Sequence, residues 1–150
     1  MKLFLFFFFS LLACCSPAAA QEFINMPYNK AEAALKKAYP GKSGQPAVYT
    51  RKDSILVQVS DLTQLIYVFD EKGLCMTETT KTRCDSCHNG YLEVILNKKK
   101  YNWKKINENQ YISRYEDNMM IELVPEAEIR TFSIFRADFT REVYELLLKD

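Results

Sequence analysis

Short segments with two-residue periodicity, joined by tight turns, constrain the fold of this chain more than any other feature of its sequence. In Ser54–Ser60, Ile55, Val57 and Val59 recur at every second position, which is the period of a half-buried β-strand. Comparable segments follow, separated by turn-forming residues such as those of Asp70–Gly73. Connections this short join antiparallel strands, because a parallel crossover needs about a dozen residues or more. The sequence therefore predicts an antiparallel sheet.

About eight strands are expected, in two sets of four. The first set comprises Ala47–Arg51, Ser54–Ser60, Thr63–Asp70 and Leu74–Thr80. The second set comprises Tyr101–Ile106, as a short edge strand, Gln110–Tyr115, Met119–Val124 and Ile129–Arg136.

Three helices are expected beside these strands. Asn29 is placed to cap the first helix, which Tyr39–Gly41 ends. The second is expected to begin near Ser86 and to end at the charged run Lys98–Lys100. Asp138 is expected to cap a third, C-terminal helix. The apolar stripe of this last helix comprises Phe139, Val143, Leu146 and Leu147.

The elements therefore follow the order helix, four strands, helix, four strands, helix. This order predicts a single α+β domain over residues 21–150, with the helices packed on one face of the antiparallel sheet. An α-β-β-β-β pattern over residues 28–80 recurs over residues 86–136 and indicates an internal repeat with almost no residue identity. In outline the chain resembles the repeated helix-plus-sheet modules of the β-lactamase inhibitor proteins, which are small and exported. The resemblance is one of architecture and rests on no motif.

Residues 1–20 have the features of a secretory signal peptide. One charge, Lys2, precedes an apolar run too short to span a membrane, and Ala18–Ala20 forms a small-residue cleavage site. We therefore expect export, to the periplasm or outside the cell. Leu11–Cys14 offers an alternative, because it resembles a lipobox in which a lipidated Cys14 would anchor the protein to a membrane. No later stretch is long and apolar enough for a transmembrane span.

The charge balance argues against nucleic acid as a partner. The chain has 20 Lys and Arg against 19 Asp and Glu, and Lys2 lies in the leader, so the mature chain is formally neutral. The basic run Lys98–Lys100 is therefore interpreted as a solvated helix end.

Cys84–His88 has the sequence Cys-Asp-Ser-Cys-His, which is the spacing of covalent haem attachment. In that alternative Cys84 and Cys87 bond a haem c and His88 is its proximal iron ligand. The sixth ligand would be external or one of Met26, Met76, Met119 and Met120. Small c-type cytochromes are mostly helical, whereas this chain is rich in predicted strands, so we expect no cofactor.

The preferred interpretation of the cysteines is a structural disulfide. Cys75 lies in a strand that precedes the second helix, so we expect it to bond Cys84 or Cys87 at the start of that helix. Two alternatives remain. One is a thiol–disulfide exchange pair formed by Cys84 and Cys87, and the other is a zinc site formed by Cys75, Cys84, Cys87 and His88. Without a ligand role, His88 is expected to be a core residue with one satisfied hydrogen bond.

Motifs for catalysis are missing from the sequence, which contains no nucleophile elbow, no zinc-protease helix and no glycine-rich phosphate loop. We therefore expect an exported, non-enzymatic module that binds a protein or a small ligand. The alternative is a mono-haem electron-transfer protein. Tyr101, Trp103 and Tyr111 lie near the expected sheet edge and are candidates for a binding patch, although packing in the core explains most aromatic residues more simply.

Overall fold

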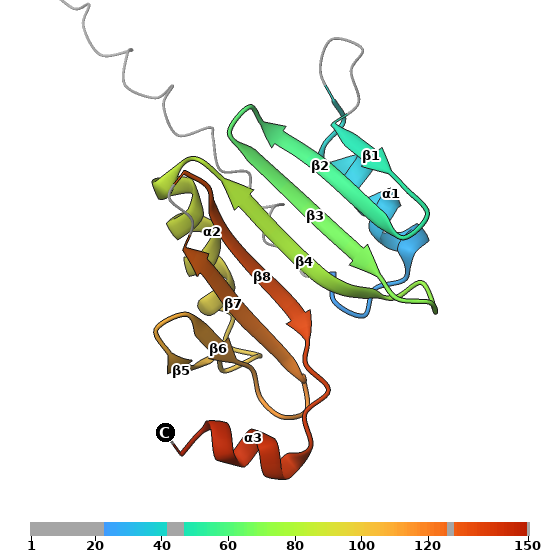
Figure 1. Ribbon diagram of the computed structural model, residues 1–150. Coiled ribbons are helices and arrows are strands. Elements are labelled where there is room, and N and C mark those ends of the chain that lie inside the picture. The colour runs from blue at the N-terminus through green and yellow to red at the C-terminus, as the bar shows by residue number, and fades with distance from the viewer. Residues whose placement is uncertain (1–22, 42–46, 126–127, 150) are drawn as a thin grey trace, which may run out of the picture.

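One antiparallel sheet organises the chain, of which the computed structural model describes residues 23–41, 47–125 and 128–149. The helices are α1 (Tyr28–Ala38), α2 (Asp85–Leu96) and α3 (Arg141–Leu147). The strands are β1 (Val48–Thr50), β2 (Ser54–Ser60), β3 (Thr63–Phe69), β4 (Cys75–Thr82), β5 (Lys104–Asn107), β6 (Gln110–Ile112), β7 (Met119–Pro125) and β8 (Arg130–Arg136). They pair in the order β1-β2-β3-β4-β8-β7-β6-β5, and each pairing is antiparallel (Figure 1).

The sheet consists of two four-stranded meanders that meet at its centre. Each meander follows a helix, and the last strand of each, β4 or β8, lies in the middle of the sheet. Six residue pairs join these two strands, from Thr77↔Phe135 to Thr82↔Arg130. The predicted α+β class, with an eight-stranded antiparallel sheet and a C-terminal helix, is therefore confirmed.

The periodicity of the sequence accounts for the side chains that face inward. In β3, Thr63, Leu65, Tyr67 and Phe69 are buried at every second position, as a strand with one covered face requires. Helix α1 turns Ala31 and Leu35, which are four residues apart, toward the sheet.

Helices α1 and α2 cover the same face of the sheet, each over its own hydrophobic core (Figure 1). The core between α1 and the sheet includes Leu35 of the helix and Ile55, Val57, Leu65 and Tyr67 of the strands. The core between α2 and the sheet includes Ile95 of the helix together with Tyr101, Ile121, Phe132 and Ile134.

A polar strip on β4 lies between the two cores. Glu78, Thr80 and Thr82 are buried, and the pairing Leu65↔Thr80↔Phe132 places a threonine directly between the two apolar sets. Paired residues of neighbouring strands share a face of the sheet, so this strip belongs to the face that α1 and α2 cover. The inner face is thus two small cores joined by a hydroxyl-rich strand.

Helix α3 lies near the end of β6, apart from α1 and α2 (Figure 1). The Tyr144 hydroxyl donates to the Ser113 carbonyl at 3.0 Å. Ile112 and Met120 pair with each other on the face opposite α1 and α2 and are nevertheless buried, so this end of the opposite face is covered.

Two predicted helix caps are wrong. Pro27, not Asn29, precedes the first turn of α1, and it makes no side-chain cap. Thr140 caps α3 by accepting a hydrogen bond from the Val143 N–H at 3.4 Å. Asp138 has a φ of 46°, in the left-handed region, whereas a capping residue adopts an extended backbone.

Candidate functional site

The start of α2 carries a disulfide between Cys84 and Cys87, with a Cα–Cα distance of 5.2 Å. Strand β4 leads into the helix through Arg83, and Cys84 is the capping residue. The Cys84 Sγ atom accepts a hydrogen bond from the backbone N–H of Cys87 at 3.1 Å. The Ser86 hydroxyl lies 3.3 Å from the same sulfur. A sulfur atom therefore replaces the usual oxygen at this helix end.

Thr82 fixes the backbone that enters this turn. Its side chain is buried, and its Oγ1 atom accepts a hydrogen bond from the Cys84 N–H at 3.1 Å. The hydroxyls of Thr82 and Thr63 lie 2.8 Å apart and share a second hydrogen bond. Two buried threonines on neighbouring strands, Thr63 and Thr82, thus hold Cys84 at the end of β4.

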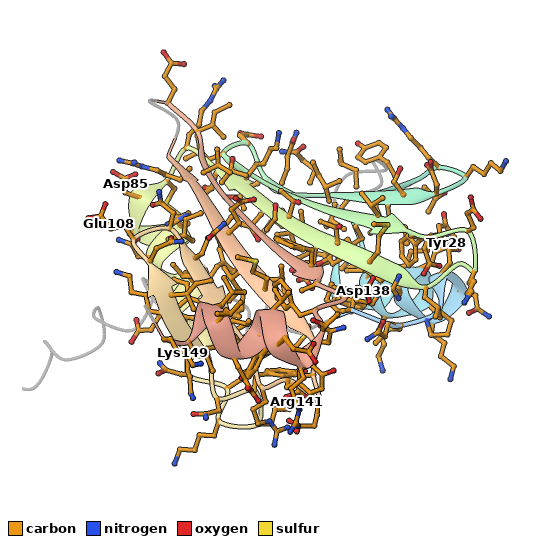
Figure 2. The ribbon with its side chains drawn as sticks, turned by 60° about the horizontal axis from the view of Figure 1, so that its bottom comes forward. Tyr28, Asp85, Glu108, Asp138, Arg141 and Lys149 are labelled. Atoms are coloured by element: carbon orange, nitrogen blue, oxygen red, sulfur yellow. A yellow bond between two sulfur atoms is a disulfide. The ribbon has the colours of Figure 1, made fainter. Side chains whose placement is uncertain are left out.

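The predicted disulfide from Cys75 to the helix is wrong, because Cys75 is free and buried. Cys75 begins β4, and Cys84 follows its end. Nine residues of extended chain separate two points by on the order of 25–30 Å, whereas disulfide-bonded residues have Cα atoms within about 7 Å. In Figure 2, Asp85 and Tyr28 mark opposite sides of the molecule, and the Tyr28 N–H bonds the carbonyl of Gly73 near the start of β4.

His88 lies one residue beyond the disulfide and is half-buried. Its ring packs edge-on against Phe132 with 5.5 Å between centroids, and its Nδ1 atom lies 3.2 Å from Asn89 Oδ1. The neighbouring carboxylate of Asp85 accepts a hydrogen bond from Arg130 Nε at 3.0 Å, which ties the first turn of α2 to β8.

This arrangement does not favour the haem or zinc alternatives. The two sulfurs that would bond a haem are bonded to each other, and the His88 ring is packed against Phe132. Cys75 lies under α1, away from the other proposed zinc ligands. Within the described ranges, no three His, Cys, Asp or Glu side chains gather in a group that could hold a metal ion.

A second candidate site is the sheet face that α1 and α2 leave uncovered. We define the open face by six residues: Tyr49, Leu56, Ile66, Val68, Thr79 and Phe135. Their registers run Tyr49↔Leu56↔Ile66↔Thr79 and Val68↔Thr77↔Phe135 across five neighbouring strands. Tyr49 is 47% exposed and the others are half-buried. Figure 1 shows this face of β1–β4 and β8 toward the viewer, with α1 and α2 behind it.

The candidate aromatic patch at the sheet edge belongs to the core. Tyr101 is buried, and Trp103 and Tyr111 pack half-buried against the residues under α2. Their burial follows from their side of the sheet, since Tyr111 pairs with the fully buried Ile121.

The burial of Glu78 is a feature that the sequence analysis missed. Glu78 is only 4% exposed, and its Oε2 atom accepts a hydrogen bond from the Phe23 N–H at 3.3 Å. Burial raises the pKa of Tyr67 well above its usual value, and the nearby Glu78 carboxylate raises it further. The sequence does contain a feature that indicates this burial. Glu78, Thr80 and Thr82 lie at every second position, which places all three on one face of β4.

Comparison with known protein families, with curated proteins and with solved structures finds no match to this chain. None of the helices in the described part is long and apolar enough to cross a lipid bilayer. The predicted signal peptide over residues 1–20 and the alternative lipidation site Cys14 lie outside the described residues.

Proposed function

We propose that this protein is an exported, non-enzymatic binding module, periplasmic or at the cell surface, that holds a partner protein against its open face. The observation that carries the proposal is the run of apolar residues Tyr49, Leu56 and Ile66 across three adjacent strands. The solvated face of an antiparallel sheet normally carries polar residues at such positions. Tyr49 is exposed and Leu56 and Ile66 are half-buried, and a contiguous apolar patch that stays partly open to solvent is typical of interaction sites.

Export is supported by two features. The leader-like residues 1–20 combine an apolar run with a small-residue cleavage site. The disulfide at Cys84 and Cys87 fits an oxidising compartment, because thiols in the cytosol are kept reduced.

The shape of the open face favours a protein over a small ligand. The hollow at its end, by the β2–β3 turn, has a volume of about 210 Å³ and is open to solvent. Sites for small molecules are usually enclosed clefts of about 300–1,000 Å³. The hollow is lined by polar and charged residues, including Gln64, Lys81, Arg83 and Asp61. Such a lining suits a single polar side chain of the partner protein, at the rim of a larger contact. The patch includes the exposed Tyr49 on the edge strand β1, and tyrosine is a common anchor of protein interfaces.

Site-specific photo-crosslinking in the exporting cell tests this proposal. A photoreactive phenylalanine analogue at position 49 should yield one discrete adduct with another protein. The same analogue at Leu146, which is 62% exposed on α3, is the matched control and should yield no such adduct. Ile66→Lys places a charge in the middle of the open face and should abolish the adduct from position 49, with circular dichroism checking that the variant folds.

Three outcomes would contradict the proposal. The first is equal cross-linking from positions 49 and 146, which would indicate collisions rather than a binding face. The second is an adduct of twice the protein's own mass, which would make the occupant a second copy of this chain. The third is an adduct from position 49 that survives Ile66→Lys in a folded variant.

A further inference from the structure

The Cys84–Cys87 disulfide links two residues of one helical turn and joins no separate elements of the fold. Helix α2 is attached to the sheet by other contacts, namely the buried Ile95, the His88–Phe132 ring contact and the Asp85–Arg130 ion pair. A purely structural disulfide stabilises a fold most when it closes a long loop of the chain. The Cys84–Cys87 bond closes only a short turn that the helix already forms. Breaking the bond therefore leaves every element of the fold attached.

The surroundings of Cys84 stabilise a thiolate. The Cys87 N–H points at Cys84 Sγ at 3.1 Å, and the Ser86 hydroxyl lies within 3.3 Å of it. The N-terminus of the 12-residue helix α2 adds the positive end of its dipole at the same point. Hydrogen-bond donors and a helix N-terminus lower the pKa of a thiol and favour its reactive form.

Access separates this pair from Cys75, the other cysteine in the described part of the chain. Cys84 and Cys87 are each partly exposed, whereas Cys75 is fully buried. Burial raises the pKa of the Cys75 thiol to about 12, so that thiol stays protonated and has no path to an external reagent. Among the described cysteines, only Cys84 and Cys87 are therefore open to an external thiol.

We propose that Cys84 and Cys87 form a reversible thiol–disulfide exchange site for an external thiol, with Cys84 as the sulfur that forms the mixed disulfide. The external thiolate attacks Cys84 Sγ, the bond between Cys84 and Cys87 breaks, and its electron pair leaves on Cys87 Sγ, which takes up a proton. A second external thiolate then attacks the external sulfur of the mixed disulfide, and Cys84 leaves as the thiolate that its hydrogen bonds stabilise. The two external thiols are oxidised to a disulfide, and the pair gains two electrons. This exchange chemistry goes beyond the proposed binding function.

Reduction of the folded protein is the first test. The oxidised chain is incubated in parallel with glutathione, a small monothiol, and with dithiothreitol, a dithiol, then quenched with acid and alkylated. Mass spectrometry should find Cys84 and Cys87 alkylated and Cys75 untouched, while circular dichroism stays native and reoxidation restores the bond. The arm that succeeds identifies the kind of thiol that the site uses. If neither reagent reduces the pair faster than the protein unfolds globally, the bond is purely structural and the proposal fails.

The second test distinguishes the two sulfurs. Cys87→Ser leaves Cys84 as a single thiol, and Cys84→Ser leaves Cys87, so each variant is the matched control of the other. Near neutral pH, a chromogenic aryl disulfide should react about tenfold faster with Cys84 than with Cys87, because only Cys84 is stabilised as a thiolate. Ser86→Ala in the Cys87→Ser background should slow Cys84 several-fold. Equal rates for the two single thiols, or no effect of Ser86→Ala, would overturn the role assigned to Cys84.

Discussion

Replacement of Thr82 by valine tests whether the buried threonine pair holds the helix start. The substitution preserves shape but removes the hydroxyl that bonds Thr63 at 2.8 Å and accepts the Cys84 N–H at 3.1 Å. Two hydrogen bonds are lost, so the Thr63 hydroxyl and the Cys84 N–H are left without a partner next to position 82. Thr82 is only 1% exposed, so water does not replace its hydroxyl. Each stranded buried group costs about 1–3 kcal/mol, and the added methyl group returns about 0.8 kcal/mol. We expect Thr82→Val to lower the free energy of unfolding by about 2–4 kcal/mol.

The double substitution provides the internal control. Thr63→Val alone removes one hydrogen bond, and Thr82 still accepts from Cys84, so we expect a loss of about 1–2 kcal/mol. With both threonines replaced, no hydroxyl is stranded on β3, and the loss should fall short of the sum of the two single losses by about 1 kcal/mol. Urea unfolding of all four proteins, followed by circular dichroism, measures each term. Additive losses within about 0.3 kcal/mol would refute the reasoning, since they would show that the two hydroxyls do not interact.

Three further predictions concern other contacts of the fold. Burial raises the pKa of Cys75 from 9.0 to about 12, so its contribution to stability is complete below pH 9.0 and is lost as the pH rises toward 12; urea midpoints at alkaline pH should fall more steeply for the wild type than for Cys75→Ala. The hydrogen bond from Arg136 at 2.6 Å and two backbone N–H groups lower the pKa of Asp70, so its contribution is present above its usual pKa and is lost as the pH falls through the lower folded value. The difference in melting temperature between the wild type and Asp70→Asn should therefore disappear in strong acid. Tyr144→Phe removes the 3.0 Å hydrogen bond to the Ser113 carbonyl, which should cost about 1 kcal/mol and speed amide hydrogen exchange in α3.

Most of the sheet could be predicted because its strands alternate cleanly. Ser54–Ser60 and Gln110 to Ile112 begin where the sequence pattern begins, and short joints such as Asp70–Gly73 left only antiparallel pairing. What no pattern could supply was the order of the strands. The pairing of β4 with β8 joins residues far apart in the sequence, such as Glu78 and Ile134, and local periodicity carries no information about such pairs.

The candidate sites were harder to predict for a physical reason. Strand β4 is polar on both faces, with Thr79 and Lys81 on one side and Glu78 and Thr80 on the other, so its sequence does not show which side is covered. The same strand makes the predicted Cys75 disulfide wrong, because residues close in sequence lie far apart when the chain between them is extended. An eight-residue strand that leads straight into a helix separates a cysteine at its start from that helix by nearly its full length.

Strand β4 contributes residues to both proposed sites. Its inward threonines anchor the disulfide turn through Thr82, while its outward Thr79 takes part in the open face between Ile66 and Ser133. Successive side chains of a strand point to opposite faces, so the two proposed sites use different rows of side chains on β4. The strand is paired along its length with β3 on one side and β8 on the other. The proposed exchange at Cys84 therefore depends on the inner row of β4 and the proposed binding on its outer row, although the two sites share a strand.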